Sequence, residues 1–278
     1  RSTLFPYTTL FRSIGNLEDI TFRAVRVLLE AQVIACEDTR QTRKLLEHYS
    51  IGTPLISYHE HNERERAAEL VDRMARGEVV ALVTDAGTPL VSDPGYRLVS
   101  ASIHAGLQVT PIPGPAAPIA ALTAAGLATH RFRFLGFLPP KAGRRLALLE
   151  ELRPSEETTI FFESPHRVLE TLQQLAEVLG PARPVVVARE VTKLHEEFVR
   201  GTVGDVLGEL TGRGSLKGEF TILVGPTPEG APLAEAPDYQ EELNRLLAQG
   251  MARMDAVKHM ARQHKLGKRT IYRLLEEH

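Results

Sequence analysis

Short apolar runs alternate with segments of helical periodicity along most of this chain, and this alternation restricts the fold more than any other feature. Each run ends at polar or turn-forming residues, as expected of buried strands followed by loops. The runs are Val33–Cys36, Val79–Val83, Val109–Ile112, Thr158–Phe162, Val185–Ala188 and Phe220–Val224. Strands that alternate with helices favour an α/β fold whose sheets contain parallel strands.

The 278 residues are enough for two α/β domains and a smaller module. We place the first boundary before Pro113-Gly114-Pro115, where rigid prolines flank a flexible glycine, so we expect α/β domains at residues 1–112 and 113–225. Residues 226–238 contain four prolines and a glycine, a composition typical of a linker. Residues 239–278 then form a helical module with a helix-turn-helix-like pattern.

Composition narrows the class of protein. The formal net charge is only −2, so any contact with nucleic acid must come from local basic patches. The single cysteine, Cys36, excludes an internal disulfide and a four-cysteine zinc site. We find no apolar run of about 18 residues and no N-terminal signal pattern. We therefore expect a cytoplasmic protein without membrane contact.

The most informative stretch is Val79–Gly95, in which an expected buried strand ends in a loop of small residues, prolines and acids. Loops at the carboxyl ends of parallel strands are where α/β proteins bind ligands. Gly87 allows close approach of a ligand, and Asp85 and Thr88 offer hydrogen-bonding groups. The alternative is an ordinary strand-to-helix turn with Asp93 as the helix cap.

Phosphoryl transfer and metal binding are both disfavoured. An aspartate after a strand, as in Asp85–Thr88, is also found in phosphatases of the haloacid dehalogenase type. Those enzymes carry a second aspartate two residues later, where this chain has Gly87, so a magnesium site would lack a ligand. His59 and His61 could share one face of a strand, but no third metal ligand is evident. We therefore expect no metal.

At this point the sequence resembles a known family. Asp85–Gly95 is similar to the hallmark loop of ribosomal RNA methyltransferase I, within the tetrapyrrole methylase superfamily. Eight other segments occur in the order that the family shows: Ile14–Thr21, Glu37–Arg40, Tyr58–Asn62, Pro111–Ala116, Gly136–Lys141, Phe161–Arg167, Ala188–Glu196 and Lys217–Phe220. No single short motif decides the resemblance, which rests on their common order from about Ile14 to the C-terminus.

The resemblance implies a cofactor and a substrate. By this resemblance we expect two α/β domains that form a cleft for S-adenosylmethionine, usually in a homodimer. The implied cofactor-binding residues are Asp85, Ala86, Gly87, Thr88, Pro89, Val91, Ser92, Pro115, Ala116, Phe162 and Glu219. The implied reaction is 2'-O-methylation of one cytidine in the decoding region of 16S ribosomal RNA, on naked RNA or on the 30S subunit. A tetrapyrrole methyltransferase and an RNA-binding protein with an inactive cofactor site are the alternatives.

Charged residues at the expected strand ends are candidates for catalysis and for RNA binding. A carboxylate could act as general base for a ribose hydroxyl, and the candidates are Glu37, Asp38, Glu163 and Glu190. Basic side chains beside the same strand ends could contact phosphates, and these are Arg40, Lys141, Arg167, Arg189 and Lys193. For each residue taken singly, capping or a surface ion pair is the alternative.

The C-terminal tail is a second basic signal. From Gly250 to His278 the sequence has seven Lys or Arg against three acids. We predict a helix from Asp255 through His264, then a turn, then a basic helix over Lys268–Leu275, which together resemble a helix-turn-helix. Lys268 and Arg269 are the candidate RNA contacts. The alternative is a helical hairpin that covers the catalytic domain.

Residues 1–13 depart from the family pattern. The family has a hydrophobic first strand that runs into a Thr-Pro before the Ile-Gly-Asn motif, whereas here Ser13 occupies the proline position. The segment resembles translated sequencing-adaptor sequence, and we hypothesise that it is not native. The competing interpretation is a real strand of unusual composition, which Pro6 would weaken because proline cannot donate a ladder hydrogen bond.

Overall fold

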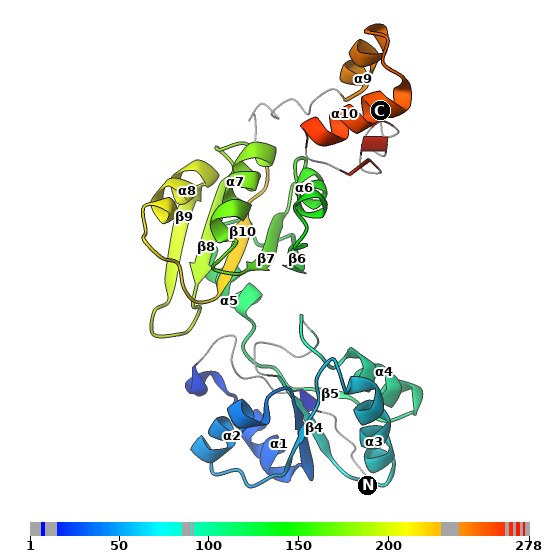
Figure 1. The fold of residues 1–278 in the computed structure, drawn as a ribbon. Helices are drawn as coiled ribbons and strands as arrows, with labels where there is room; N and C mark the ends of the chain where they lie inside the picture. Colours follow the sequence, from blue (N-terminus) through cyan, green and yellow to red (C-terminus); the bar gives the residue numbers. More distant parts are fainter. Residues whose placement is uncertain are drawn as a thin grey trace. The chain divides into compact units, whose positions relative to one another are not determined.

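The computed structural model describes residues 16–84, 90, 92–228, 239–264, 267–268, 271–272 and 275, and the backbone of residues 7–8. The chain forms two compact units. The first consists of Arg1–Ala121 and Glu190–Glu197, and the second of Leu122–Arg189 and Phe198–His278. Each unit contains one five-stranded sheet with helices, so the expected α/β class with two sheets is confirmed (Figure 1).

The first sheet is parallel throughout its paired strands. Its strands are β1 (Tyr7–Thr8), β2 (Val33–Cys36), β3 (Leu55–Ser57), β4 (Val80–Val83) and β5 (Thr110–Pro111). They lie in the order β3-β2-β4-β1-β5, and every pair of neighbours runs parallel. The backbone of β1 therefore occupies a central position between β4 and β5. The rest of the atypical segment, residues 1–6 and 9–13, lies outside the described residues.

Helices cover both faces of this sheet. They are α1 (Phe22–Glu30), α2 (Thr39–His48), α3 (Glu63–Ala75) and α4 (Tyr96–His104), after a short 3-10 helix at Leu17–Asp19. Along β2, Ile34 and Cys36 pack in one apolar cluster with α1 and α2, whereas Val33 and Ala35 pack in a second cluster with α3 and α4. Burial of every residue of β2 and β4 is typical of parallel strands between two helical layers.

Helix α1 shows how the sequence fixes these elements. Thr21 is its N-cap, and the hydroxyl oxygen accepts a hydrogen bond from the backbone N–H of Ala24 at 3.2 Å. Ala24, Val27 and Leu28 are buried at the three- and four-residue spacing of one helical face. Phe22, on another face, is 98% exposed. The apolar spacing thus sets which side of the helix meets the sheet.

The second sheet is mixed. Its strands are β6 (Phe132–Phe137), β7 (Thr158–Glu163), β8 (Pro184–Arg189), β9 (Glu197–Thr202) and β10 (Phe220–Val224), in the order β6-β7-β10-β8-β9. β6 and β7 are parallel, but β10 runs antiparallel to both β7 and β8. The expectation of parallel strands is therefore wrong for β10. A short apolar run records burial and not direction, so the sequence pattern could not reveal this reversal.

The second unit also holds the remaining helices. These are α6 (Ala142–Glu150), α7 (Val168–Leu179), α8 (Val203–Thr211), α9 (Tyr239–Ala248) and α10 (Arg253–Gln263), while α5 (Ala117–Ala125) contains the boundary between the two units. The helix predicted from Asp255 begins instead at Arg253, with Ala252 as N-cap. Asp255 lies in its first turn and pairs with Lys258 at 2.7 Å. No described helix is both long and apolar enough to span a bilayer.

The C-terminal tail shares the apolar core of the second unit. Tyr239, Leu243, Val257, Met260 and Ile271 are each at most 4% exposed and belong to the same buried cluster as residues of α6, α7 and the second sheet. α9 and α10 pack against each other, and His264 after α10 contacts Glu242 of α9 at 2.7 Å. The tail is thus a packed part of this unit, in agreement with the alternative of a helical hairpin that covers the catalytic domain. The helix-turn-helix role stays a prediction.

Candidate active site

The carboxyl ends of the first sheet's strands bring several candidate segments to one edge. Because β2, β3 and β4 are parallel, Glu37, Tyr58 and Thr84 follow them at the same side of the sheet. The backbone N–H of Tyr58 donates to the carbonyl of Cys36 at 2.8 Å and extends the pairing beyond β3. Cys36 itself is fully buried, as expected of a packing residue.

Asp38 caps helix α2 and pairs with Arg40. Its carboxylate accepts hydrogen bonds from the Arg40 backbone N–H at 2.8 Å and from the Arg40 guanidinium at 2.8 and 3.1 Å. The hydrogen bonds from the Arg40 side chain and backbone lower the pKa of Asp38 to about 2. The contacts give Asp38 a capping role, and its role as general base stays a prediction.

The loop after β4 is preceded by a buried hydroxyl group and ends in left-handed backbone. Asp85, Ala86, Gly87, Thr88, Pro89 and Val91 lie outside the described residues. Before them, Thr84 is 2% exposed, and its hydroxyl has no hydrogen-bond partner among the described residues. After them, Leu90 and Ser92 adopt left-handed backbone conformations, with φ of 71° and 69°. Such conformations are costly for residues with side chains and gather at ligand-binding loops.

Gly95 closes this loop by a tight approach to two leucines. Its φ is +136°, and a Cβ atom there would lie 2.8 Å from Leu82 Cδ2 and 3.0 Å from Leu90 Cδ1. Leu90 packs against the cluster that contains Leu82. The loop is thereby anchored in the core of the first unit by one leucine, and only glycine leaves room for that anchor.

An open cavity of about 620 Å³ lies beside this turn. Its charged lining comes from Glu60, Glu63, Asp93 and Arg97, of which Glu63 and Arg97 form an ion pair at 2.5 Å. The sequence did not reveal this cavity, because its lining comes from two separate segments that only the fold brings together. His59 and His61 lie close to one lining segment, with ring centroids 5.9 Å apart. In the described part of the chain no three acid, histidine or cysteine side chains form a metal-binding group.

The segment after β5 leads into α5. Pro115 and Ala116 are half-buried, and the Ala116 carbonyl accepts a hydrogen bond from the Ala120 N–H at 2.9 Å. Ala116 thus begins the helix, and its role toward a cofactor stays a prediction.

The second sheet gathers another group of candidates at one end. Phe220, the first residue of β10, lies opposite both Glu163 at the end of β7 and Arg189 at the end of β8. Glu219 therefore lies at this end as well. Phe162 packs against Phe134 and Phe137, with ring centroids 5.0 and 5.4 Å apart. The parallel β6 ends here too, and exposed Lys141 follows it in the loop before α6.

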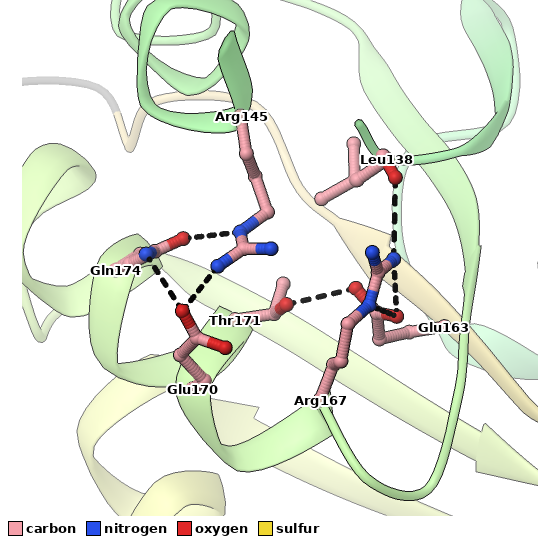
Figure 2. A network of polar contacts seen from close by, with 7 residues as sticks. All are labelled: Leu138, Arg145, Glu163, Arg167, Glu170, Thr171 and Gln174. Carbon is pink, nitrogen blue, oxygen red and sulfur yellow. Dashed lines mark hydrogen bonds and ion pairs between the residues drawn. The ribbon is translucent and has the colours of Figure 1, made fainter. Parts of the chain in front are cut away.

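Glu163 is the most enclosed of the candidate carboxylates. Its side chain has no exposed surface, and Oε1 accepts hydrogen bonds from the Ser164 N–H at 2.8 Å and from Arg167 Nε at 2.7 Å. Oε2 accepts a hydrogen bond from the Thr171 hydroxyl at 2.8 Å. Arg167 also donates to the Leu138 carbonyl at 3.2 Å, so it connects the loops after β6 and β7 (Figure 2).

A second polar network lies farther along α7. Arg145, only 1% exposed, donates to Gln174 Oε1 at 2.5 Å and forms an ion pair with Glu170 (Figure 2). Neither Arg145 nor Glu170 was a candidate from the sequence. The network joins α6 to α7 within the second unit.

The remaining candidates are more dispersed. Glu190 and Lys193, which belong to the first unit, form an ion pair at 2.8 Å, and Glu190 has a left-handed φ of 50°. Arg189 Nε donates to the Lys217 carbonyl at 2.6 Å in the second unit. Lys268 is exposed and helical, whereas Arg269 lies outside the described residues.

Comparisons with known sequences identify similar proteins. Residues 13–207 match the profile of the tetrapyrrole (corrin/porphyrin) methylases. The ribosomal RNA small subunit methyltransferase I of Synechocystis sp. is 47% identical, with 94% of each chain covered. The protein of that name from Halalkalibacterium halodurans is 44% identical over 100% of this chain and 96% of its own length, and that of Bacillus subtilis is 40% identical over 93% and 90%.

Solved structures show the same two-unit fold at lower sequence identity. The methyltransferase CobJ matches with a TM-score of 0.60 and 23% identity over 81% of this chain and 94% of its own. A uroporphyrin-III C-methyltransferase from Thermus thermophilus, solved with S-adenyl homocysteine, matches with a TM-score of 0.55 and 22% identity over 80% and 97%. At these identities the likeness concerns the fold.

Proposed function

Since this chain belongs to the ribosomal RNA small subunit methyltransferase I family, within the tetrapyrrole methylases, we propose that it methylates small-subunit ribosomal RNA with S-adenosylmethionine as methyl donor. The observation that carries the proposal is the 47% identity over 94% of the chain to a relative of that name. We further propose that the acceptor is the 2'-hydroxyl of a cytidine in 16S ribosomal RNA, as the sequence resemblance implies.

The loop after β4 is a suitable place for the cofactor. Thr84 supplies a buried hydroxyl without a partner among the described residues, and Leu90 and Ser92 have left-handed backbone conformations of the kind that gathers at ligand-binding loops. These features support the proposal that the segment between Thr84 and Gly95 holds the cofactor. When bound, S-adenosylmethionine supplies a methyl group that its sulfonium already activates, so the reaction requires no metal. The cofactor cleft that the resemblance implies between the two domains stays a prediction.

The protein's own contribution is alignment and proton removal. Holding the ribose oxygen in line with the donor supplies most of the effect, because orientation converts a bimolecular reaction into an intramolecular one. A carboxylate then accepts the hydroxyl proton. We propose Glu37 or Glu190 for this role, because both are partly exposed, whereas Asp38 caps a helix and Glu163 has no exposed side-chain surface.

The exposed basic residues would bind the phosphates of the RNA. Lys141 and Lys268 are exposed, and Arg40 is 87% exposed beyond its contact with Asp38. Phosphate contacts position RNA without specifying its sequence. We propose that the active form is a homodimer that works in the cytoplasm on 16S ribosomal RNA or on the 30S subunit. The family resemblance supports the dimer, and light scattering coupled to gel filtration tests it.

Transfer of labelled methyl groups tests the function. Undermodified 30S subunits and naked ribosomal RNA are incubated with the protein and labelled cofactor, and the label is mapped by mass spectrometry. We expect one 2'-O-methylated cytidine. Label on a base would contradict the proposed 2'-hydroxyl acceptor. Label on a uroporphyrin-type tetrapyrrole and none on RNA would contradict the proposed function and favour the alternative methyltransferase. Cofactor binding without any transfer to RNA would contradict it as well, and absence of cofactor binding would favour the inactive RNA-binding alternative.

A further inference from the structure

We propose that Glu163 is a positioning residue that holds Arg167 ready for a phosphate of the RNA, so that Glu163 acts through Arg167 and does not touch the reacting atoms. The inference deepens the proposed function and depends on it for the identity of the ligand. It assigns the pair to RNA binding and removes Glu163 from the candidate general bases.

The first step is the enclosure of Glu163. Its side chain has no exposed surface, and it accepts hydrogen bonds from Ser164, Arg167 and Thr171. Figure 2 shows the contacts with Arg167 and Thr171. A general base must come within hydrogen-bond reach of the proton that it removes. A carboxylate enclosed by Ser164, Arg167 and Thr171 is arranged to bind these groups, and a ribose hydroxyl has no access to it.

The second step is the state of Arg167. Nε and Nη2 both lie 2.7 Å from Glu163 Oε1, and Nη2 also donates to the Leu138 carbonyl at 3.2 Å. In the part of the chain that the structure describes, Nη1 has no hydrogen-bond or ion-pair partner, and 23% of the side chain is exposed. One side of the guanidinium is therefore fixed by the protein, while the other still has N–H groups to donate.

The third step is the preference of this group for an anion. A guanidinium carries five donors and no acceptor, and its planar shape matches phosphate oxygens. The conformational freedom that a surface arginine would lose on binding is already restricted here by the contacts with Glu163 and Leu138. The loop that Arg167 ties through Leu138 leads to exposed Lys141, so a second cation follows in the same loop. An RNA phosphodiester fits this combination.

The second network on α7 provides a matched control. Glu170 pairs with Arg145, which is more buried than Arg167, and it lies on the same helix as Thr171. Glu170→Gln removes one carboxylate charge from an ion pair of the second unit, as Glu163→Gln does. It leaves Arg167 and Glu163 in place. Any general effect of a weakened ion pair should therefore appear in both variants.

The experiment compares Glu163→Gln, Arg167→Gln, the double variant and Glu170→Gln in the full-length protein. Steady-state methylation of undermodified 30S subunits gives kcat and KM, and direct titration with a fragment of the ribosomal RNA gives affinity. We expect Glu163→Gln to raise the KM for RNA about tenfold, the size of one charge-assisted hydrogen bond, with little change in kcat. Glu170→Gln should leave KM unchanged, and Glu163→Gln should add nothing in the Arg167→Gln background.

Three outcomes would overturn the inference. A fall in kcat of a hundredfold or more at unchanged KM, with an altered pH profile, would make Glu163 the base, since general bases contribute about that much. Equal effects of Glu163→Gln and Glu170→Gln would mean that Glu163 has a purely structural role. Additive effects of Glu163→Gln and Arg167→Gln would mean that Glu163 does not act through Arg167. If the wild type binds the RNA but methylates none, the proposed function fails, while the titrations of the four variants still decide the role of Glu163.

Discussion

At the scale of single residues, the turn that ends the hallmark loop depends on the absence of a side chain at Gly95. The backbone there has φ of +136°, and the space beside it is filled by Leu82 and Leu90. Two separate costs would follow from adding a methyl group, one from the backbone conformation and one from the contact. Both costs fall on the segment that we propose to hold the cofactor.

We predict that Gly95→Ala lowers the free energy of unfolding by about 2 kcal/mol and weakens cofactor binding, because Leu90 must move. Gly106→Ala is the control, since Gly106 also has a positive φ, +70°, but no atom lies within 4 Å of the added Cβ. Gly106→Ala should cost less and leave cofactor affinity unchanged. Urea unfolding and calorimetric titration with the cofactor provide the measurements. Equal losses in both variants would refute the packing argument.

The charge of Asp38 should contribute to the pH dependence of stability. Hydrogen bonds from Arg40 lower its pKa in the folded protein to about 2 from an ordinary value of 3.8. A lowered pKa means that the stabilisation is fully present above about pH 4 and is lost as the pH falls toward 2. An asparagine at this position would still cap α2. We therefore predict that Asp38→Asn is less stable than wild type at pH 7 and that the difference shrinks as the pH falls from about 4 to about 2. Urea unfolding at each pH tests this, and a constant difference would contradict it.

The sequence located the charged residues at the strand ends but could not assign their contacts. Asp38 and Glu163 were expected at strand ends, and both lie there. Asp38 pairs with Arg40, which is only two residues away in the sequence. Arg167, in contrast, donates to the carbonyl of Leu138, which is far away in the sequence, so only the fold reveals this contact. Arg145 would be expected on the solvent face of an amphipathic helix, yet it is 1% exposed. Burial of a long charged side chain depends on partners that only the tertiary fold supplies.

At the scale of elements, prediction succeeded where strands are buried on both faces. The runs Val33–Cys36 and Phe220–Val224 coincide with β2 and β10. The sequence did not reveal β3, β6 and β9, and all three lie at the edges of their sheets. Edge strands are partly exposed, so polar residues such as Arg133 interrupt the apolar run that marks a strand. The two-unit α/β class was therefore predictable, whereas the full sheet order and the reversed direction of β10 were not.

Helix α8 provides a test of how much hydrogen bonds in the first turn stabilise a helix. Thr202 and Asp205 form a capping box, in which each side chain accepts a hydrogen bond from the other's backbone N–H at 3.2 Å. The hydrogen bond with the Thr202 side chain also lowers the pKa of Asp205. We predict that Thr202→Ala lowers the free energy of unfolding by about 1 kcal/mol. Thr211→Ala, in the last turn of the same helix, is the control and should be nearly neutral in urea unfolding. The prediction fails if the two variants lose equal stability.

At the scale of the whole molecule, the tail combines a buried apolar side with an exposed basic side. Its buried residues belong to the cluster that also contains Leu149 and Leu172 of the second unit. Deletion of residues 239–278 would therefore expose a core surface in addition to removing cations. We predict a clear fall in melting temperature for that deletion, measured by circular dichroism, because large buried side chains each contribute about 2 kcal/mol. An unchanged melting temperature would show that the tail is an independent module.

Substitution of the exposed cations alone separates RNA binding from folding. Arg253, Arg262 and Lys268 are exposed in the tail. We predict that replacing all three with Gln leaves the melting temperature within error, since surface substitutions rarely exceed about 0.5 kcal/mol. RNA affinity should fall, and the slope of log K against log salt should become shallower by roughly 0.7 for each phosphate of single-stranded RNA that the variant no longer neutralises.

The same charge change in the first unit provides the comparison. Three exposed arginines there were not candidates for RNA binding. Arg43 lies on α2, Arg64 lies on α3, and Arg76 follows α3 directly. Replacing these three with Gln alters the net charge of the protein by the same amount. If the tail contacts phosphates directly, only the tail variant should change the salt slope. Equal slopes for the two variants would mean that the cations of the tail act through net charge alone, and the tail would then serve only to cover the core of the second unit.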